Sequence, residues 1–122
     1  MARILVVDDD AAITELVKEI LSAQGHVFDA AASGEEALRK IAKDGFDLVI
    51  LDRNMPGMSG LQVLRTLRAQ PATAKLKVIV CTAAEMLSEV EEAFTAGATD
   101  YLVKPLDFEK LKAKVARHAA RG

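Results

Sequence analysis

The sequence predicts an α/β fold in which a single doubly wound parallel sheet of five strands carries helices on both faces. Short apolar runs without a polar break, such as Leu48–Leu51, are typical of strands that are buried on both faces. Each run precedes a segment whose apolar residues recur at helical spacing. The two kinds of segment alternate along the chain, which is typical of parallel sheets with right-handed crossovers. We expect one domain, 1–122, because 51% hydrophobic residues suffice for a core and a charged fraction of 28% does not indicate disorder.

The first half of the chain holds three predicted strands and two predicted helices. Arg3–Val7 is the first strand, and a weaker candidate, His26–Ala31, is the second. Ser33 and Glu36 form a capping-box pattern that opens the second helix, and Asp47–Asp52 is the third strand. The first helix lies between the first two strands, and its predicted apolar face consists of Ile13, Leu16, Val17, Ile20 and Leu21.

The second half of the chain holds two strands and three helices. Ser59 and Gln62 match a second capping box, which opens the third helix. Val78–Cys81 is the fourth strand and Tyr101–Val103 the fifth, and the last helix starts near Asp107. The residues expected to face inward are Leu61, Leu64 and Leu67 in the third helix, Leu87, Val90 and Phe94 in the fourth, and Phe108, Leu111 and Val115 in the fifth.

Four of the five strands stop on polar residues. Asp8 and Asp9 follow the first strand, Asp52 ends the third, Thr82 follows the fourth and Lys104 follows the fifth. The carboxyl ends of parallel strands meet at one edge of the sheet, where ligands of open α/β sheets bind. We therefore expect these five side chains to converge.

The chemistry of such a cluster is specific. Two like unit charges about 4 Å apart repel by roughly 4 kcal/mol at an effective dielectric constant near 20. Three carboxylates therefore need a cation, and Mg²⁺ suits oxygen ligands that it can share with a phosphate. Lys104 adds positive charge and Thr82 a hydroxyl donor, both of which stabilise a phosphoryl group. A carboxylate can itself accept that group.

The matched motifs carry a family resemblance. ILVVDDD, LVILDRNMPGMSG, VIVCTA and GATDYLVKP span Ile4–Pro105. With them the chain resembles the receiver domain of two-component response regulators, and most of all the stand-alone receivers of the chemotaxis type. The resemblance implies the flavodoxin-like (βα)5 fold with strand order 2-1-3-4-5.

The resemblance also implies roles for individual residues. Asp52 would accept phosphate from a phosphohistidine on a sensor histidine kinase or a histidine phosphotransfer protein, in a Mg²⁺-dependent reaction. Thr82 and Lys104 would contact the phosphoryl oxygens. The metal ligands would be Asp8, Asp9, Asp52 and the main-chain carbonyl of Asn54.

A second set of implied roles concerns switching. Thr82 and Tyr101 would form the switch pair, and the Lys104–Pro105 peptide bond would be cis. The fourth helix, fifth strand and fifth helix would contact a downstream protein. The chain would then be a signalling phosphoacceptor that assists its own phosphorylation and dephosphorylation, and not an enzyme. We expect a monomer, with a phosphorylation-dependent dimer as the alternative.

Composition narrows the class of partner. A net charge of −2 gives no general attraction to nucleic acid or to an anionic membrane, and no apolar run approaches a membrane span. The single cysteine, Cys81, fits a cytoplasmic protein. His26 and His118 match no motif and are expected at the surface.

Two alternatives remain at this stage. A phosphatase of the haloacid-dehalogenase type also has an Asp-x-Asp after its first strand. In that reading Asp8 is the nucleophile, Asp10 the acid, and Thr82 and Lys104 contact phosphate; Asp10 is otherwise expected to cap the first helix. The other alternative is a binding scaffold of receiver shape that is never phosphorylated.

Overall fold

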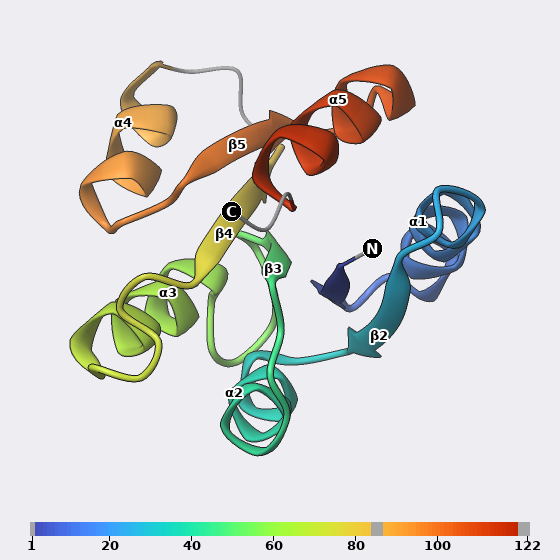
Figure 1. The fold of residues 1–122 in the computed structure, drawn as a ribbon. Helices are drawn as coiled ribbons and strands as arrows, with labels where there is room; N and C mark the ends of the chain where they lie inside the picture. The colour runs from blue at the N-terminus through green and yellow to red at the C-terminus, as the bar shows by residue number, and fades with distance from the viewer. Residues whose placement is uncertain (1, 84–86, 120–122) are drawn as a thin grey trace.

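A computed structural model, which describes residues 2–83 and 87–119, confirms the predicted fold (Figure 1). Five strands alternate with five helices along the chain. The strands are β1 (Arg3–Val7), β2 (Val27–Ala31), β3 (Leu48–Asp52), β4 (Lys77–Thr82) and β5 (Asp100–Val103). The helices are α1 (Ala11–Ala23), α2 (Gly34–Lys43), α3 (Gly60–Ala69), α4 (Leu87–Thr95) and α5 (Phe108–His118).

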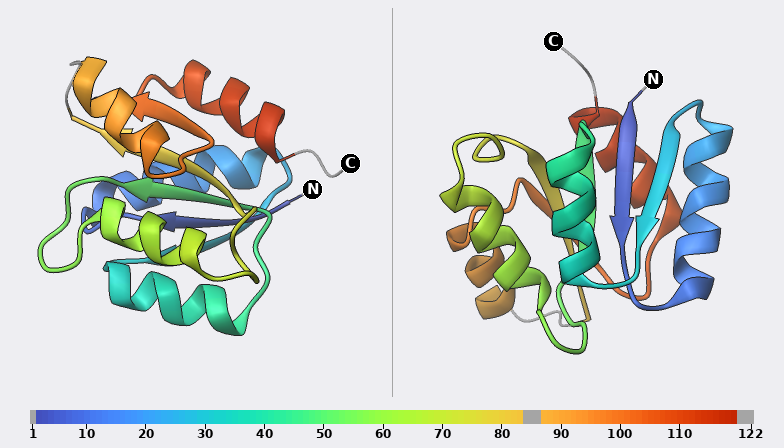
Figure 2. Two further views of the ribbon diagram at one scale, coloured as in Figure 1. Left: turned by 90° about the vertical axis from the view of Figure 1, so that its left-hand side faces the viewer. Right: turned by 90° about the horizontal axis from the view of Figure 1, so that it is seen from below.

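The sheet is parallel throughout, with the order β2-β1-β3-β4-β5. Helices lie on both of its faces (Figure 2). α1 and α5 contribute to the core on one face, whereas α2, α3 and α4 contribute to the core on the other. β3 lies in the middle of the sheet, so Asp52 at its end occupies the centre of the carboxyl edge.

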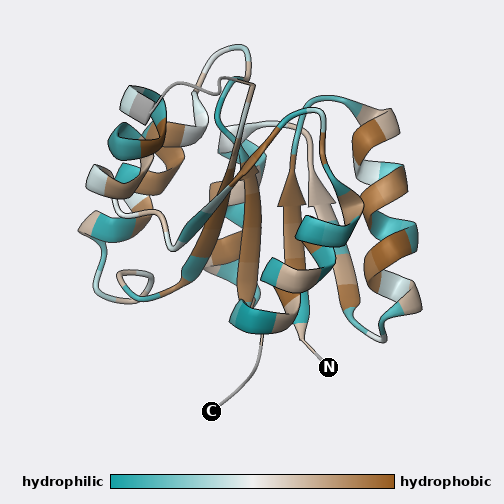
Figure 3. Cartoon of the chain, turned by 90° about the horizontal axis from the view of Figure 1, so that it is seen from above, coloured by the Kyte–Doolittle hydropathy of each residue, from teal (hydrophilic) through white to brown (hydrophobic). Residues whose placement is uncertain are grey.

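Two thin hydrophobic cores follow from the alternation of side chains along each strand. Leu5, Val49 and Val78 are neighbours across β1, β3 and β4 and face the α2–α3 side. Residues one position further along, such as Val6, face the α1–α5 side. Figure 3 shows the central strands as largely hydrophobic ribbons, whereas hydrophobic and hydrophilic residues alternate along the helices beside them. This pattern confirms that the apolar runs are strands buried on both faces.

Side chains at the helix starts supply the expected caps. Asp10 accepts hydrogen bonds from the main-chain N–H groups of Ala12 and Ile13. Ser59 and Gln62 form a complete reciprocal capping box at α3. At α2, Ser33 accepts from the Glu36 N–H, but the Glu36 carboxylate accepts from Ala32 rather than from Ser33. The box predicted at Ser33 and Glu36 is therefore only half formed.

Three apolar side chains predicted to be inside are exposed. Leu16, Phe94 and Phe108 keep 45%, 44% and 38% of their surface accessible. On α1 the stripe that contacts the sheet is narrow, with Val17 and Leu21 fully buried, so Leu16 lies on its flank. Phe94 likewise lies beside α4's buried residue Ala93, and Phe108 is the first residue of α5. The expected burial of Leu87 falls outside the side chains that the structure describes.

Within residues 2–83 and 87–119, every helix is too short or too polar to cross a lipid bilayer.

Candidate functional site

The polar strand ends meet at the carboxyl edge of the sheet. β1 ends at Val7, which pairs in register with Leu51, so Asp8 and Asp52 follow at the same level. Thr82 is the last residue of β4, and its carbonyl accepts a hydrogen bond from the Lys104 main-chain N–H at 2.8 Å. The topology therefore brings together side chains that are up to 96 positions apart in the sequence.

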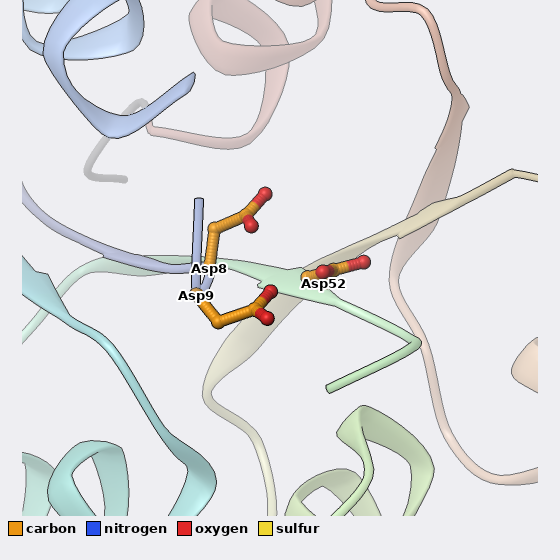
Figure 4. A group of neighbouring side chains, drawn as sticks. All are labelled: Asp8, Asp9 and Asp52. Atoms are coloured by element: carbon orange, nitrogen blue, oxygen red, sulfur yellow. The ribbon is translucent and has the colours of Figure 1, made fainter. Parts of the chain in front are cut away.

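Three carboxylates form the centre of the site. Asp8, Asp9 and Asp52 each offer an oxygen atom, and these atoms lie within 4.8 Å of one another. Figure 4 shows the three side chains at the ends of β1 and β3, with the Asp9 carboxylate directed toward Asp52. Asp8 and Asp52 are each 5% exposed, whereas Asp9 is exposed to solvent. The cluster thus has a buried base and an open side.

Lys104 is the positive charge that reaches this cluster. Its Nζ atom lies 2.8 Å from Asp8 Oδ2 and 3.4 Å from Asp52 Oδ2. Burial disfavours the charged ammonium, but the hydrogen bond to Asp8 and the nearby Asp52 charge outweigh this effect and raise the pKa of Lys104. The lysine is therefore firmly protonated at neutral pH.

The negative charge of Asp52 is only partly balanced by its surroundings. Burial is the main cause that raises its pKa above the usual 3.8, and the Asp8 charge adds to the increase. Lys104 opposes both effects, as does the hydrogen bond from the Asn54 main-chain N–H to Asp52 Oδ1 at 3.3 Å. One ammonium group does not balance three carboxylates, so the site attracts further positive charge.

The donor set fits a magnesium ion. Carboxylate oxygens are the hard ligands that Mg²⁺ takes, and the ion commonly shares one or two carboxylates with a phosphate. The residues that would hold it are Asp8, Asp9 and Asp52, and the open side at Asp9 leaves room for water or phosphate oxygens. A carbonyl ligand from Asn54 stays a prediction.

Thr82 and Tyr101 lie on the adjacent strands β4 and β5, where Tyr101 pairs with Val80, two residues before Thr82. Thr82 is 1% exposed, and its hydroxyl donates to Glu89 Oε2 at 3.4 Å. The Tyr101 ring is partly buried, packs edge-on against Phe94 at a centroid distance of 6.0 Å, and has the Lys114 Nζ atom 4.3 Å from its centroid. The Lys104–Pro105 peptide bond is cis.

Gly60 shapes the loop between Asp52 and α3. A Cβ atom at this position would overlap the main-chain oxygen of Asp52. The Gly60 N–H donates to the Arg53 carbonyl at 2.9 Å, which closes the loop against the end of β3. Only glycine lets the first turn of α3 approach the candidate site this closely.

Sequence reasoning missed two side-chain contacts, one beside the site and one at the opposite edge of the sheet. Arg53 contacts Glu89 and Glu92 on α4, and nothing in the pattern signals this, because it depends on how α4 is rotated against the sheet. His118 matches no motif and was expected to lie at the surface. It is instead 16% exposed at its side chain, with Nε2 2.9 Å from Asp100 Oδ2.

Comparison with known proteins decides between the families that this geometry allows. A family model described as the response regulator receiver domain matches residues 4–116. The chain belongs to the response regulator receiver family. Its strand order and its acidic cluster are those that this membership implies, and the haloacid-dehalogenase alternative is not favoured.

The receiver is similar to proteins from several bacteria. The response regulator protein FleR of Pseudomonas aeruginosa is 43% identical over 118 residues, which are 97% of this chain and 24% of FleR. A putative response regulator from Chloroflexus aurantiacus matches with a TM-score of 0.93 at 37% identity, over 98% of each chain. The chemotaxis protein CheY4 of Vibrio cholerae matches with a TM-score of 0.90 at 35% identity, over 97% of this chain and 98% of CheY4.

This receiver spans only part of the length of the curated relatives that it matches. It spans about a quarter of FleR and about half the length of PhoP of Pseudomonas aeruginosa and HprR of Escherichia coli. Response regulators of this family interact with histidine kinases and with downstream targets. Membership therefore establishes a receiver of two-component signalling, and the donor and the target of this chain are matters for proposal.

Proposed function

We propose that this receiver accepts a phosphoryl group on Asp52 from the phosphohistidine of a sensor histidine kinase or a histidine phosphotransfer protein. The observation that carries the proposal is the setting of Asp52. It is a buried carboxylate at the end of the central strand, 3.4 Å from Lys104 and grouped with Asp8 and Asp9. In the reaction an Asp52 oxygen forms the new bond to phosphorus while the bond to the histidine nitrogen breaks.

The neighbours of Asp52 support its role over that of Asp8. Asp8 Oδ2 is paired with Lys104 at 2.8 Å, and Asp8 Oδ1 accepts from the Asp10 main-chain N–H at 2.9 Å. Asp52 is further from the ammonium, at 3.4 Å, so a group added to it can take up that donor. A phosphoryl group adds about −1.5 to −2 charges, and Lys104 is the side chain available to balance them.

Magnesium is the cofactor that we propose for this reaction. It would be held by Asp8, Asp9, Asp52 and the main-chain carbonyl of Asn54. When bound, it supplies the positive charge that lets phosphoryl oxygens approach three carboxylates. Asp8 and Asp9 then serve to hold charge at the site, while Asp52 keeps an oxygen for the phosphoryl group.

We propose that the signal leaves through Thr82 and Tyr101. The Thr82 hydroxyl would bond a phosphoryl oxygen, Tyr101 would turn inward, and the surface of α4, β5 and α5 would bind a downstream protein. A charge-assisted hydrogen bond of about 1.5–3 kcal/mol is enough to shift a two-state population by roughly ten- to a hundredfold. We also propose a monomeric, cytoplasmic protein that dimerises, if at all, on phosphorylation and binds neither nucleic acid nor membrane directly.

Intact mass after incubation with acetyl phosphate tests the phosphoacceptor. The expected result is one phosphate per chain that requires Mg²⁺, maps to Asp52 and is lost in Asp52→Asn. Asp10→Asn is the matched control, because Asp10 caps α1 in a receiver but would be the acid of a phosphatase. It should still be labelled at Asp52. A phosphate that maps to Asp8, or labelling that survives Asp52→Asn, would overturn the proposal.

A chain that takes up no phosphate needs a second measurement. Beryllofluoride binds an aspartate as a phosphoryl mimic and does not hydrolyse, so NMR shifts on its addition would indicate a short-lived phosphoaspartate. A protein that is folded by circular dichroism and shows no such shifts would be a scaffold that is never phosphorylated, against the proposal.

A further inference from the structure

The carboxylate of Glu89 joins two parts of the site that are separate in the sequence. Its Oε2 atom accepts from the Thr82 hydroxyl at 3.4 Å, and its Oε1 atom lies 3.4 Å from Arg53 Nη1. Glu89 stands on α4, Thr82 ends β4, and Arg53 directly follows Asp52. One side chain therefore connects the proposed phosphoacceptor strand, the proposed switch hydroxyl and the helix beside them.

Arg53 is held firmly enough to orient Glu89. Its main-chain N–H donates to the Cys81 carbonyl at 2.8 Å, and its own carbonyl accepts from Gly60 at 2.9 Å. The side chain is 15% exposed, and its Nη2 atom pairs with Glu92, one turn beyond Glu89 on α4. Among the described residues its buried Nε atom has no hydrogen-bond partner. Its Nη1 and Nη2 atoms contact Glu89 and Glu92 separately, so Glu89 keeps its own contact with the guanidinium when Glu92 is replaced.

We propose that Glu89, oriented by Arg53, is the resting acceptor of the Thr82 hydroxyl and so sets how readily the receiver is activated. Glu89 is a positioning residue in this account, because it acts through Thr82. The inference rests on the proposed function, in which the Thr82 hydroxyl bonds the group added to Asp52. It goes beyond that function because it identifies the hydrogen-bond acceptor, Glu89, that the Thr82 hydroxyl gives up when the receiver is activated.

The Thr82 hydroxyl group has a single proton to donate. Thr82 can donate that proton to the Glu89 carboxylate or to a phosphoryl oxygen, but not to both. A charged acceptor makes the stronger bond, so the resting contact competes with the active one. The 3.4 Å separation is long for an O–H···O bond, and the effect of removing it is correspondingly small.

Arg53 explains why Glu89 stays beside Thr82. The Glu89 side chain is about one-third exposed, and a carboxylate with access to water gains little from a single distant hydroxyl. The guanidinium supplies a fixed positive partner on the protein side. Without it, Glu89 would turn toward solvent and release Thr82, so loss of Arg53 should act in the same direction as loss of Glu89.

Beryllofluoride titrations in Mg²⁺ buffer, followed by NMR, test the inference. Glu89→Gln keeps the shape of the side chain but makes it a weaker hydrogen-bond acceptor for Thr82. The apparent Kd of this variant for beryllofluoride should therefore be roughly two- to fivefold lower than that of the wild type. Glu92→Gln is the matched control, because it removes the same charge from the same helix and its described contact is also with Arg53. It should bind like the wild type. Arg53→Met should resemble Glu89→Gln, and the double variant should not exceed either.

A Thr82→Ala background separates positioning from a general effect. There the Glu89→Gln change should disappear, because the hydroxyl through which it acts is gone. Equal changes in Glu89→Gln and Glu92→Gln, or a Glu89 effect that persists without Thr82, would overturn the inference. A Kd for beryllofluoride that is the same in the wild type and in Glu89→Gln would also overturn the inference. A wild type that binds none at all would instead overturn the proposed function, and this inference with it.

Discussion

Asp52 carries its charge at a cost to the stability of the fold. Burial and the Asp8 charge raise its pKa above 3.8. A raised folded-state pKa means that stability from this group is fully present below about 3.8 and is lost as the pH rises through the folded value. At pH 7 without metal, ionised Asp52 therefore destabilises the receiver. The residue best placed to accept a phosphoryl group is also a source of strain in the resting site.

Replacement of Asp52 by Asn should stabilise the metal-free receiver. The amide keeps the shape and removes the repulsion from Asp8, so we expect the free energy of unfolding to rise by on the order of 1 kcal/mol. Urea denaturation at pH 7 in a chelating buffer measures the change. The gain should shrink as the pH falls through the raised pKa of Asp52, because wild-type Asp52 then takes up a proton. Glu15→Gln, an exposed change on α1, should leave stability nearly unchanged; an equal gain there would point to net charge alone.

The residues of the site divide into those that sequence predicts and those that it cannot. Asp8, Asp52 and Thr82 were predictable because the end of a buried parallel strand fixes both the edge and the direction of the next residue. The Arg53 contacts with α4 were not, and neither was the His118–Asp100 contact at the start of β5, away from the site. They join long side chains on elements whose rotation and spacing come only from packing.

Among the elements, α3 is fixed to the site by its first residue. Gly60 lies against the main-chain oxygen of Asp52, and the complete capping box of Ser59 and Gln62 sets where the helix starts. The sequence predicts the cap from residue types and spacing. It does not predict the close approach, because the residue type alone does not show what a Cβ atom at this position would meet.

A methyl group at Gly60 should disturb both the fold and the site. Gly60→Ala must push α3 away from β3, which we expect to cost roughly 1–3 kcal/mol of unfolding free energy. It should also lower the yield of phosphorylated Asp52, since the loop after this residue shifts. Gly45→Ala is the matched control, because a Cβ there meets nothing within 4 Å. Thermal unfolding measures the stability, and the acetyl phosphate assay measures the yield of phosphorylated Asp52. If Gly60→Ala matched the wild type in both, the close approach of α3 to β3 would not require glycine.

The helix faces show the limit of periodicity at the scale of elements. Spacing placed Leu16 and Phe94 on inward faces, and both are substantially exposed. A helix of a three-layer fold touches the sheet along a narrow line, so only part of an apolar face is covered. Val17 and Ala93 occupy that line, and no count of apolar positions distinguishes them from their neighbours.

At the scale of the whole molecule, two thin cores hold one edge of the sheet rigid. The carboxylates of Asp8 and Asp52 follow strands whose side chains are buried on both faces, so they cannot move apart to relieve their repulsion. The fold itself thus preforms a site that favours a cation. This arrangement exists only in the folded chain, because unfolding separates residues 8 and 52 along the sequence.

Magnesium should therefore raise the stability of the whole receiver. An ion that binds only the folded state adds RT ln(1 + [Mg²⁺]/Kd), which is about 2.7 kcal/mol at a hundredfold excess over Kd. For a domain of this size we expect Tm to rise by roughly 10 °C, measured by circular dichroism against NaCl of equal ionic strength. Asp9→Ala should abolish most of this rise, because Asp9 is an exposed ligand with little part in the core. Glu15→Gln should keep it in full. A Tm that responds equally to Mg²⁺ in both variants would mean that the ion acts on surface charge in general and not at the three carboxylates.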